Sequence, residues 1–548
     1  MGQFSLHAYD ADVWVEGFRG LNQAVEINGD LRYASEEYNV ETPHGVLQPM
    51  AEQEVMVSQS ADPWGDSRVE TLARFHRRWY EGEGSKDWLV CCAGGRFYYK
   101  QDGTELGWAT IPLPSGVASF DSSVWSWVTY EENVEISGVP YTVDILIMSN
   151  AQDGIIHIIP PDRPSILNDY ADNTISELGS YTIEELSSPA WSITRDATHK
   201  FGVIERYAER IWGGAIPGEP DTLMYSAVYK PDDWRPYKPD APDDDPDWGK
   251  GQPEDGGGEV KQPSWDGDSF TTLKAFGDQL IAFKEHRVWR VYGTNPGQFT
   301  FNQQFGGGAP YPNTIAVDVE KLFMADKYGV SVYDGMSVKP YARDQIEKIW
   351  RTVNQNALDQ MCAVLWDNKY YLAFPVGDST VNNALLIFDQ EEGSILYYKD
   401  VYIESLLSTY DGVYATSSSV PGRILIIHYD SWVDGKTNNK ATRWVSPWTD
   451  FGYKRIVKGG FDFYFAPEVK DEPVVLTISI QTEKKTKTKQ YTVQPLTPEQ
   501  VTAGKEAKYK RLHFGGAGRK FRIIIESDGD KPWRIVGGLH LVVETDPD

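Results

Sequence analysis

A hairpin pattern that repeats along the chain places the strongest limit on its fold. Residues 273–293 contain an apolar run, a glycine-containing turn and a second run that alternates aromatic and polar residues, and residues 320–335 repeat this order. Successive side chains of a β-strand point to opposite faces, so each pair of runs predicts a β-hairpin with one buried face. Two such hairpins in succession predict a repeated unit of antiparallel strands.

Further copies of the pattern lie on both sides of these two. Their starts are roughly 40 to 70 residues apart, the range of blade-type repeats, and the longer intervals contain loop insertions. Asp-Gly pairs beginning at Asp102, Asp153, Asp334 and Asp411 mark hairpin turns. The chain is therefore predicted to be all-β, with an irregular β-propeller of six or seven blades. The copies are residues 88–103, 144–159 and 363–374 and, more faintly, 207–214 and 411–427.

Three parts of the chain differ in pattern. Residues 1–60 contain short runs around turns, including the hairpin signal Asn28-Gly29, and we expect them to close the propeller in part by pairing with its last blade. Residues 61–432 hold the repeated hairpins and form the predicted propeller. Residues 433–548 contain strands without the hairpin pattern, at spacings that suit an antiparallel β-sandwich, which we predict as a separate second domain.

Two segments interrupt the repeats. Residues 231–262 contain six Pro and ten Asp or Glu, so we expect a surface insertion that lies outside the blade core and contributes little to stability. Its acidic residues lack the spacing of a calcium-binding loop. Residues 344–353 place Ile346, Ile349 and Trp350 at helical spacing after an acidic start, which predicts a short helix.

Composition excludes several classes of protein. Asp and Glu number 80 against 52 Lys and Arg, a formal charge of −28 that repels phosphates and disfavours a general DNA-binding role. No apolar run approaches the ~18 residues of a membrane span, and the first residues lack the pattern of a secretory signal. Cys91, Cys92 and Cys362 cannot form a disulfide framework, and we expect buried thiols in a protein made in a reducing cytoplasm.

No constellation of catalytic residues is found, so we predict no catalytic, cofactor-binding or metal-binding residues and no enzyme. Ser264–Phe270 approaches the Asp-box of sialidase-like propellers but lacks one residue and occurs once. The nine histidines form no zinc motif, and no nucleophile elbow or phosphate loop is present. Arg74 and His76 share one side of a strand, which favours an amphipathic strand over a phosphate grip. Residues 484–489, rich in lysine, favour a solvated hairpin over a phosphate or carboxylate contact.

Several segments resemble tail proteins of tailed bacteriophages, particularly the propeller-bearing nozzle or hub proteins of short-tailed phages. The likeness lies in the local sequence pattern and extends over most of the chain, including the first residues and the predicted C-terminal sandwich, residues 440–548. The segments that carry it are residues 20–22, 38–40, 44–47, 206–212, 223–226, 265–284, 288–293, 328–335 and 383–393.

This resemblance implies a structural protein without catalytic residues, located in the virion tail after synthesis in the host cytoplasm. It implies a homo-oligomeric ring, expected to contain six copies, that continues the DNA-ejection channel below the portal and adaptor. The expected partners are other copies, adaptor and portal-side tail proteins, and tail fibres or spikes. Double-stranded DNA would pass through without specific binding, and the acidic balance suits such passage.

The acidic insertion at residues 231–262 departs from the family and leaves its surface partners open. A second reading from a different class stays open as well. In it, the protein is a carbohydrate- or receptor-binding propeller at the distal tail, or a glycosidase, and tryptophan-rich loops stack on sugars. Carboxylates are too numerous in this sequence for a glycosidase pair to be chosen from it.

Overall fold

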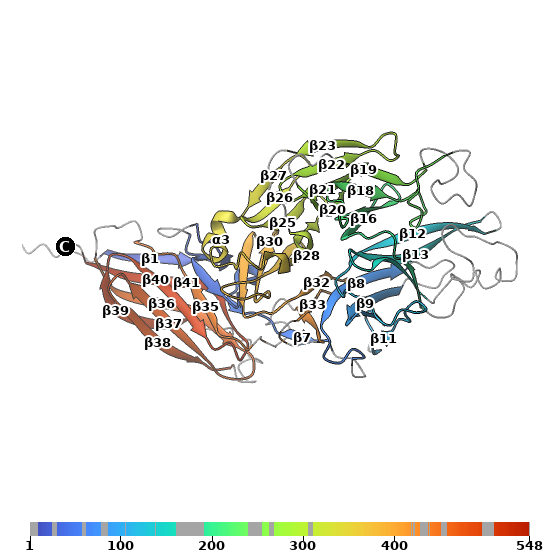
Figure 1. Ribbon diagram of the computed structural model, residues 1–548. Helices are drawn as coiled ribbons and strands as arrows, with labels where there is room; N and C mark the ends of the chain where they lie inside the picture. The colour runs from blue at the N-terminus through green and yellow to red at the C-terminus, as the bar shows by residue number, and fades with distance from the viewer. Residues whose placement is uncertain are drawn as a thin grey trace, which may run out of the picture.

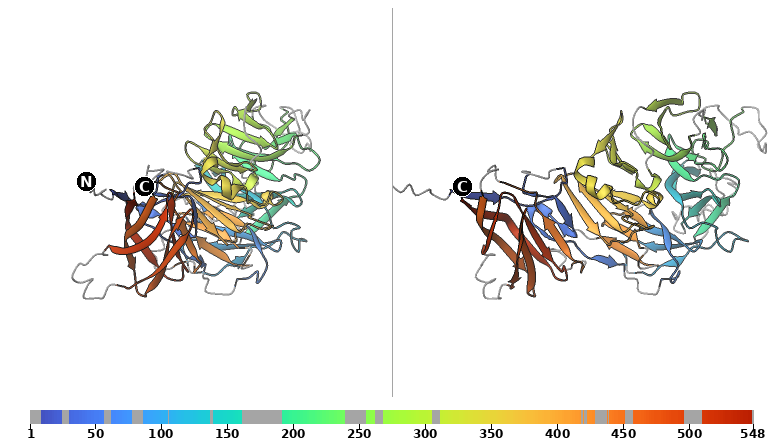
Figure 2. Two further views of the ribbon diagram at one scale, coloured as in Figure 1. Left: turned by 90° about the vertical axis from the view of Figure 1, so that its left-hand side faces the viewer. Right: turned by 60° about the vertical axis from the view of Figure 1, so that its left-hand side comes forward.

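The computed structural model describes residues 9–546, apart from internal gaps. Its strands form seven four-stranded antiparallel sheets around a channel and two further sheets packed face to face (Figures 1 and 2). A seven-bladed β-propeller therefore precedes a β-sandwich, which confirms the predicted fold class. The gaps are residues 25–29, 57–61, 78–85, 105, 137–138, 161–190, 239–254, 262–267, 305–310, 418, 420–421, 428–436, 438, 451–456 and 496–508.

The first four blades follow one another without exchange of strands, each in the order of the sequence. Blade 1 contains β8 (Val69–Arg77), β9 (Lys86–Ala93), β10 (Arg96–Gln101) and β11 (Ala109–Thr110). Blade 2 contains β12 (Ser126–Ile136), β13 (Val139–Asn150), β14 (Gly154–Ile159) and β15 (Ser192–Asp196). Blade 3 contains β16 (Val203–Tyr207), β17 (Arg210–Gly214), β18 (Thr222–Tyr225) and β19 (Gly258–Lys261). Blade 4 contains β20 (Phe270–Phe276), β21 (Gln279–Lys284), β22 (Val288–Tyr292) and β23 (Thr300–Gln304).

The last blade takes its outer strand from the start of the chain, as the sequence led us to expect. Blade 5 contains β24 (Ala316–Val317), β25 (Leu322–Asp326), β26 (Gly329–Tyr333) and β27 (Val338–Tyr341). Blade 6 contains β28 (Cys362–Trp366), β29 (Lys369–Phe374), β30 (Ala384–Asp389) and β31 (Ser394–Lys399). Blade 7 contains β32 (Ser405–Ser408), β33 (Val413–Thr416), β34 (Ile424–Ile427) and, from the N-terminal segment, β7 (Gln53–Val55).

The propeller core lies between neighbouring blades. The second strand of several blades, such as β21 and β29, is buried at every position, because apolar side chains on both of its faces meet the adjacent blades. Between blades 1 and 2, Trp88 and Trp191 meet edge to face with ring centroids 5.5 Å apart. Such contacts explain why so many of the aromatic residues of the sequence fall on strands.

An Asp-Gly turn also joins neighbouring blades. The Asp153 carboxylate, in the turn between β13 and β14, accepts hydrogen bonds from the backbone N–H groups of Asp121 and Ser122, both at 3.0 Å. Asn150 donates to the same carboxylate at 3.1 Å. Asp153 thereby fixes the connection from blade 1 to blade 2. The predicted hairpin role of this Asp-Gly pair is confirmed.

The β-sandwich draws on both ends of the chain. One sheet has the order β1 (Tyr9–Val15), β41 (Trp533–Asp546), β36 (Val457–Val469) and β39 (Lys510–Gly518). The other has the order β38 (Thr486–Val493), β37 (Val474–Thr482), β40 (Phe521–Ser527), β35 (Thr442–Val445) and β4 (Glu36–Tyr38). The prediction that residues 433–548 alone form a separate domain is therefore wrong, because β1 and β4 complete the two sheets.

The N-terminal segment also packs against blade 6. The buried Glu41 carboxylate accepts hydrogen bonds from the Tyr398 hydroxyl at 2.9 Å and from the Ala51 backbone at 2.7 Å. A Cβ at Gly20 would collide with the Ile395 carbonyl oxygen, so the segment lies directly on β31. Its remaining elements are β2 (Arg19–Leu21), β3 (Tyr33–Ala34), β5 (Val40–Glu41), β6 (Gln48–Pro49) and a 3₁₀ helix, η1 (Pro43–Gly45).

The predicted short helix is confirmed as α3 (Arg343–Trp350), which buries Ile346, Ile349 and Trp350 between blades 5 and 6. Gln23 of the N-terminal segment accepts hydrogen bonds from the Lys348 and Ile349 backbones, at 2.8 and 3.1 Å. The helix therefore lies between the propeller and the segment that leads to the sandwich. Two 3₁₀ helices, η2 (Pro312–Thr314) and η3 (Leu358–Gln360), lie on either side of it in the sequence.

The insertion at residues 231–262 is part of blade 3 at both ends, which corrects the prediction that it lies outside the core. Trp234 is buried against Phe201, with ring centroids 4.8 Å apart, and β19 is the outer strand of the blade. Arg210 is fully buried and donates to the carbonyl oxygens of Gly256 and Ser226, at 2.6 and 2.7 Å. Residues 239–254 and Gln262 lie outside the described part of the chain.

Candidate functional site

A cavity of about 1010 Å³ lies in the central channel of the propeller. Its wall consists of the first strand of every blade or the residues next to it: β8, β12, β16, β20, β24, β28 and β32. The channel along the propeller axis therefore has room for a small molecule. Its volume is at the upper end of ordinary small-ligand pockets, which hold roughly 300–1,000 Å³.

Charged side chains gather on the wall contributed by blades 1 to 4. Arg74 and His76 both contact the Asp87 carboxylate, at 3.1 and 2.8 Å. Lys274 contacts Glu205 at 3.0 Å. Each of these three side chains is thus held by a carboxylate, which supports the amphipathic-strand interpretation of Arg74 and His76 over a phosphate grip.

Blades 5 to 7 contribute a neutral wall. It contains Ile315, Val317, Ala363, Leu365 and Leu406. The channel consequently has one side with compensated charges and one apolar side. Such a wall can hold the parts of an amphipathic molecule, and no nucleophile is paired with a base among its described residues.

The buried thiols and one buried imidazole are unsuited to catalysis. Burial raises the pKa of Cys92 and of Cys362 to about 12, so both stay protonated and weakly nucleophilic at neutral pH. Cys91 is buried as well, and burial raises its pKa. The prediction of buried thiols is confirmed. Burial lowers the pKa of His157, on β14, to about 4, so its imidazole is neutral at physiological pH.

His157 predicts a specific acid sensitivity. Between about pH 6.5 and pH 4 the unfolded chain protonates this histidine and the folded chain does not, so stability present at neutral pH is lost as the pH falls. The loss is expected to approach about 3 kcal/mol. In His157→Leu this contribution is absent. Denaturant unfolding of both proteins from pH 8 to pH 4 should therefore show their stability difference changing below pH 6.5 and constant above it; a constant difference throughout contradicts the prediction.

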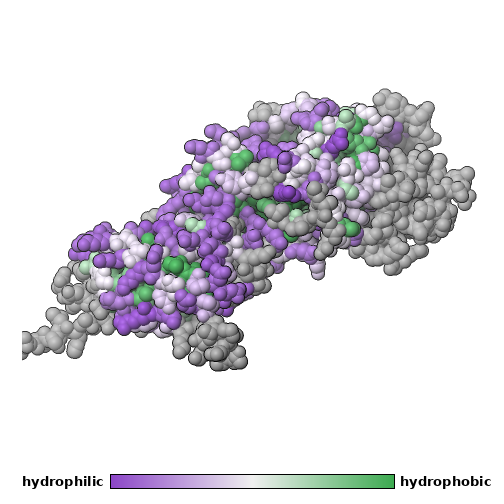
Figure 3. All heavy atoms as spheres, turned by 90° about the horizontal axis from the view of Figure 1, so that it is seen from below, coloured by the Kyte–Doolittle hydropathy of each residue, from purple (hydrophilic) through white to green (hydrophobic). Residues whose placement is uncertain are grey.

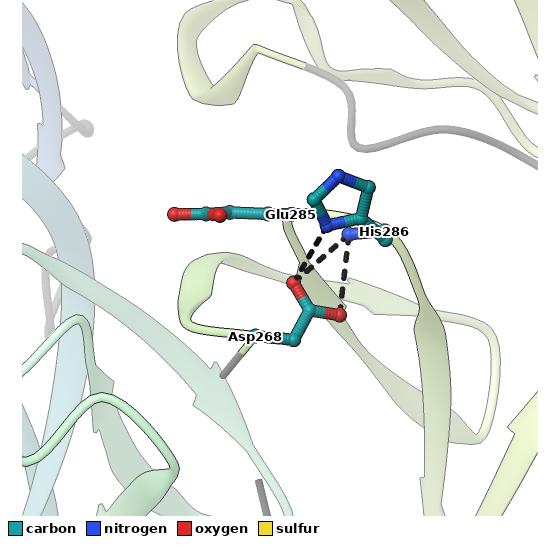
Figure 4. Close-up of side chains that lie close together, drawn as sticks. All are labelled: Asp268, Glu285 and His286. Carbon is teal, nitrogen blue, oxygen red and sulfur yellow. Dashed lines mark hydrogen bonds and ion pairs between the residues drawn. The ribbon is translucent and has the colours of Figure 1, made fainter. Parts of the chain in front are cut away.

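Asp268, Glu285 and His286 form an acidic cluster at the β21–β22 turn (Figure 4). Each can offer one ligand atom, and these atoms lie within 4.8 Å of one another. The buried Asp268 carboxylate already accepts two hydrogen bonds from the His286 backbone, at 3.0 and 3.2 Å, and lies 3.3 Å from its Nδ1. These hydrogen bonds show that Asp268 holds the β21–β22 turn in place. It belongs to the Asp-box-like Ser264–Phe270, whose first four residues lie outside the described part of the chain.

No family model matches this chain. No curated protein matches it either. Among solved structures, the chain is similar to the WD40 domain of Pan2 from Neurospora crassa, with a TM-score of 0.33 and 10% sequence identity, over 66% of this chain and 90% of that chain. Within the described residues, no helix has the length and apolar character needed to cross a membrane.

Sequence reasoning found some of these features and missed others. It placed Arg74 and His76 on one face of a strand, and that face is the channel wall. It did not identify the other charged residues of the wall, because they come from three blades that only the closed ring brings together. These residues are Glu131, Asp144, Glu205, Arg206 and Lys274. The repeating hairpins gave the strands, but no sequence signal marked which strand of each blade lies at the axis.

Proposed function

We propose that the chain is a non-enzymatic structural protein of a bacteriophage tail, made in the host cytoplasm and located in the virion. In this proposal it forms a homo-oligomeric ring of six copies, a nozzle or hub that continues the DNA-ejection channel below the portal and adaptor. Its partners are other copies, portal-side tail proteins and tail fibres or spikes. Resemblance of the sequence to propeller-bearing tail proteins is the starting point.

The observation that carries the proposal is the interlock of the two domains. The N-terminal segment supplies β1 and β4 to the sandwich and β7 to blade 7, and between them it lies on blade 6. A chain that only positions a small ligand has no need to join its domains in this way. A tail component that transmits force does, because a single flexible linker between the domains would let them separate.

Size and charge support the route of DNA in this proposal. The propeller channel has the volume of a small-ligand pocket, which is far too small for a duplex, so the DNA would pass along the axis of the ring between subunits. Acidic residues exceed basic ones by 28, and hydrophilic side chains cover most of the described surface seen in Figure 3. Acidic surface facing the axis would repel phosphates and let the DNA move.

Cryo-electron microscopy of virions that contain this chain tests the proposal. We expect density for the propeller and sandwich in a ring around the tail axis, next to the adaptor. Density at the tips of fibres, or away from the axis, contradicts it. A matched sample in which the chain carries a C-terminal tag identifies which density is this protein.

A receptor-binding role at the distal tail is the second candidate, and one observation favours it. Trp14 on β1 is 56% exposed and stacks on His540, with ring centroids 3.9 Å apart and planes 6° from parallel. Exposed indole faces bind the apolar face of sugars. A glycan array probed with the wild type and with Trp14→Ala separates the candidates: specific binding lost in the variant favours the receptor-binding role, and no binding by either protein disfavours it.

A further inference from the structure

A second cavity, of about 570 Å³, lies where the sandwich meets the propeller. Lys520, Arg522, Trp448 and Glu483 of the sandwich line it, together with Lys348 of α3 and residues of the N-terminal segment, Gln23, Ser35 and Glu36. We call it the junction cleft. It is distinct from the propeller channel.

The carboxylates of the junction cleft are occupied, whereas two of its cations are not. Glu36 contacts Arg443 at 3.0 Å, and Glu483 accepts the backbone N–H groups of Arg519 and Lys520, at 2.8 and 3.1 Å. Lys520 and Arg522 contact no carboxylate among the described residues. Two cations without a direct carboxylate contact among the described residues, beside the Trp448 ring, are suited to binding an acidic group.

Arg522 is held in position for such a role. Its Nε donates to Gln481 at 2.8 Å, and its guanidinium lies 5.0 Å from the centre of the Trp448 ring. Burial lowers the pKa of Arg522, the nearby Glu36 carboxylate opposes this, and the charge of Arg443 adds to it, with the net direction downward, so further negative charge at this site would stabilise the guanidinium cation. A ligand carboxylate would supply it.

The surroundings of the cleft are basic as well. Lys484 and Lys485 form the exposed tip of the β37–β38 hairpin, next to Glu483. Residues 436–548 hold 20 Lys and Arg against 14 Asp and Glu, a charge of +6, while residues 1–435 hold 32 against 66, a charge of −34. The acidity of the protein thus resides outside the C-terminal part, and the basic end of the sandwich complements it.

The blade 3 insertion contains a segment with the matching chemistry. Residues 239–250, which lie outside the described residues, read Pro-Asp-Ala-Pro-Asp-Asp-Asp-Pro-Asp-Trp-Gly-Lys. The chain leaves the described structure at Lys238 and returns at Asp255, so a loop of this length reaches at most about 26 Å from its anchors. Blade 3 and the sandwich lie at opposite ends of the molecule in every view (Figures 1 and 2), so the segment is remote from its own cleft.

We propose that the junction cleft binds the acidic segment 239–250 of a second copy of this chain, with Lys520 and Arg522 as the residues that contact its aspartates. The contact joins two different surfaces, blade 3 of one copy and the sandwich of the next. Contacts of this heterologous kind generate rings when the rotation closes. The inference rests on the proposed ring only for its choice of a second copy as partner.

A labelled peptide of residues 239–250 tests the cleft directly. Fluorescence anisotropy with the full-length protein should show saturable binding that weakens from 50 to 200 mM salt, as expected for charged groups. Binding should fall about tenfold or more in Lys520→Gln/Arg522→Gln, the effect of losing charge-assisted contacts. Lys487→Gln/Lys489→Gln is the matched control, because it removes the same charge from the same end of the chain outside the cleft, and it should bind nearly as the wild type does.

Three results overturn the inference. One is a peptide with all five aspartates replaced by asparagine that binds equally well. Another is peptide binding that both double variants retain. The third is duplex DNA that displaces the peptide and binds the cleft more tightly, which would make it a phosphate site. Circular dichroism and thermal unfolding of each variant establish that the change is not a loss of folding.

The full chain separates this inference from the proposed ring. A carbodiimide joins carboxylates to amines, so in a mixture of ¹⁴N- and ¹⁵N-labelled protein it should cross-link the aspartates of residues 239–250 in one copy to Lys520 in another. Arg522→Gln, which keeps both reactive groups, should reduce these cross-links. If virions contain the ring but the wild-type chain forms no such cross-links, the inference is refuted and the proposed ring stands. If copies cross-link in this way but virions contain no ring, the proposed ring is refuted and the inference stands.

Discussion

Deletion of residues 1–56 is expected to abolish the cooperative unfolding of the whole chain. The deletion removes β7 from blade 7 and β1 and β4 from the two sheets of the sandwich. It also removes six large buried apolar side chains, which together stabilise the fold by about 10 kcal/mol. A domain of ordinary stability has roughly 5–15 kcal/mol in all. The six residues are Val15, Phe18, Leu21, Val40, Leu47 and Met50.

Thermal unfolding followed by circular dichroism and by tryptophan fluorescence measures this effect. The deletion should give a broad transition or insoluble protein, whereas deletion of residues 1–8, which lie before the described structure, serves as the control and should unfold as the full chain does. If the longer deletion unfolds cooperatively within a few degrees of the wild type, the N-terminal strands are dispensable and the interlock has no energetic role.

Replacement of Arg210 by alanine is expected to cost about 3–5 kcal/mol of stability. The fully buried guanidinium donates to the carbonyl oxygens of Ser226 and Gly256 and lies near the rings of Tyr225 and Phe299. Burial lowers its pKa to about 10, which leaves it charged at neutral pH. Alanine leaves both carbonyls without this donor and opens a cavity at the place where the insertion returns to blade 3.

Arg206→Ala is the matched control on the preceding strand. Arg206 lies partly in solvent and contacts Glu131 and Glu209, at 3.5 and 2.7 Å, so its loss should cost about 1 kcal/mol or less. Urea unfolding of the two variants compares them. Similar losses would mean that Arg210 is not the anchor of Asp255 and Gly256; an increase in protease cleavage near residue 255 in Arg210→Ala alone supports the anchor.

The fold was predictable to the extent that its contacts are local. Each hairpin of blades 1 to 6 pairs strands that are adjacent in the sequence, so alternation and Asp-Gly turns were sufficient to identify them. Two N-terminal strands have partners more than 350 residues away: β1 pairs with β41, and β4 with β35. The local pattern of a single strand does not indicate which of many remote strands is its partner.

The insertion shows a second limit of sequence reasoning. Its proline and acidic residues indicated correctly that its middle cannot build a core, but Trp234 and Gly258–Lys261 at its ends belong to blade 3. The average composition of residues 231–262 gave no sign of these two buried ends. The same holds for the junction cleft, whose residues Gln23, Lys348 and Arg522 come from three separate parts of the chain.

The interlock of the two termini also determines when this chain can finish folding. β1 cannot pair before β41 has been synthesised, and the ribosome needs about 25–100 s to add the intervening residues at roughly 5–20 residues per second. During that time β1 has no native partner, although blades 1 to 6 can each form as they leave the ribosome. Blade 7 can close once β34 has been synthesised, whereas the sandwich sheet that contains β1 is completed later, and a nascent chain interrupted before residue 533 would retain an open sheet edge in the sandwich.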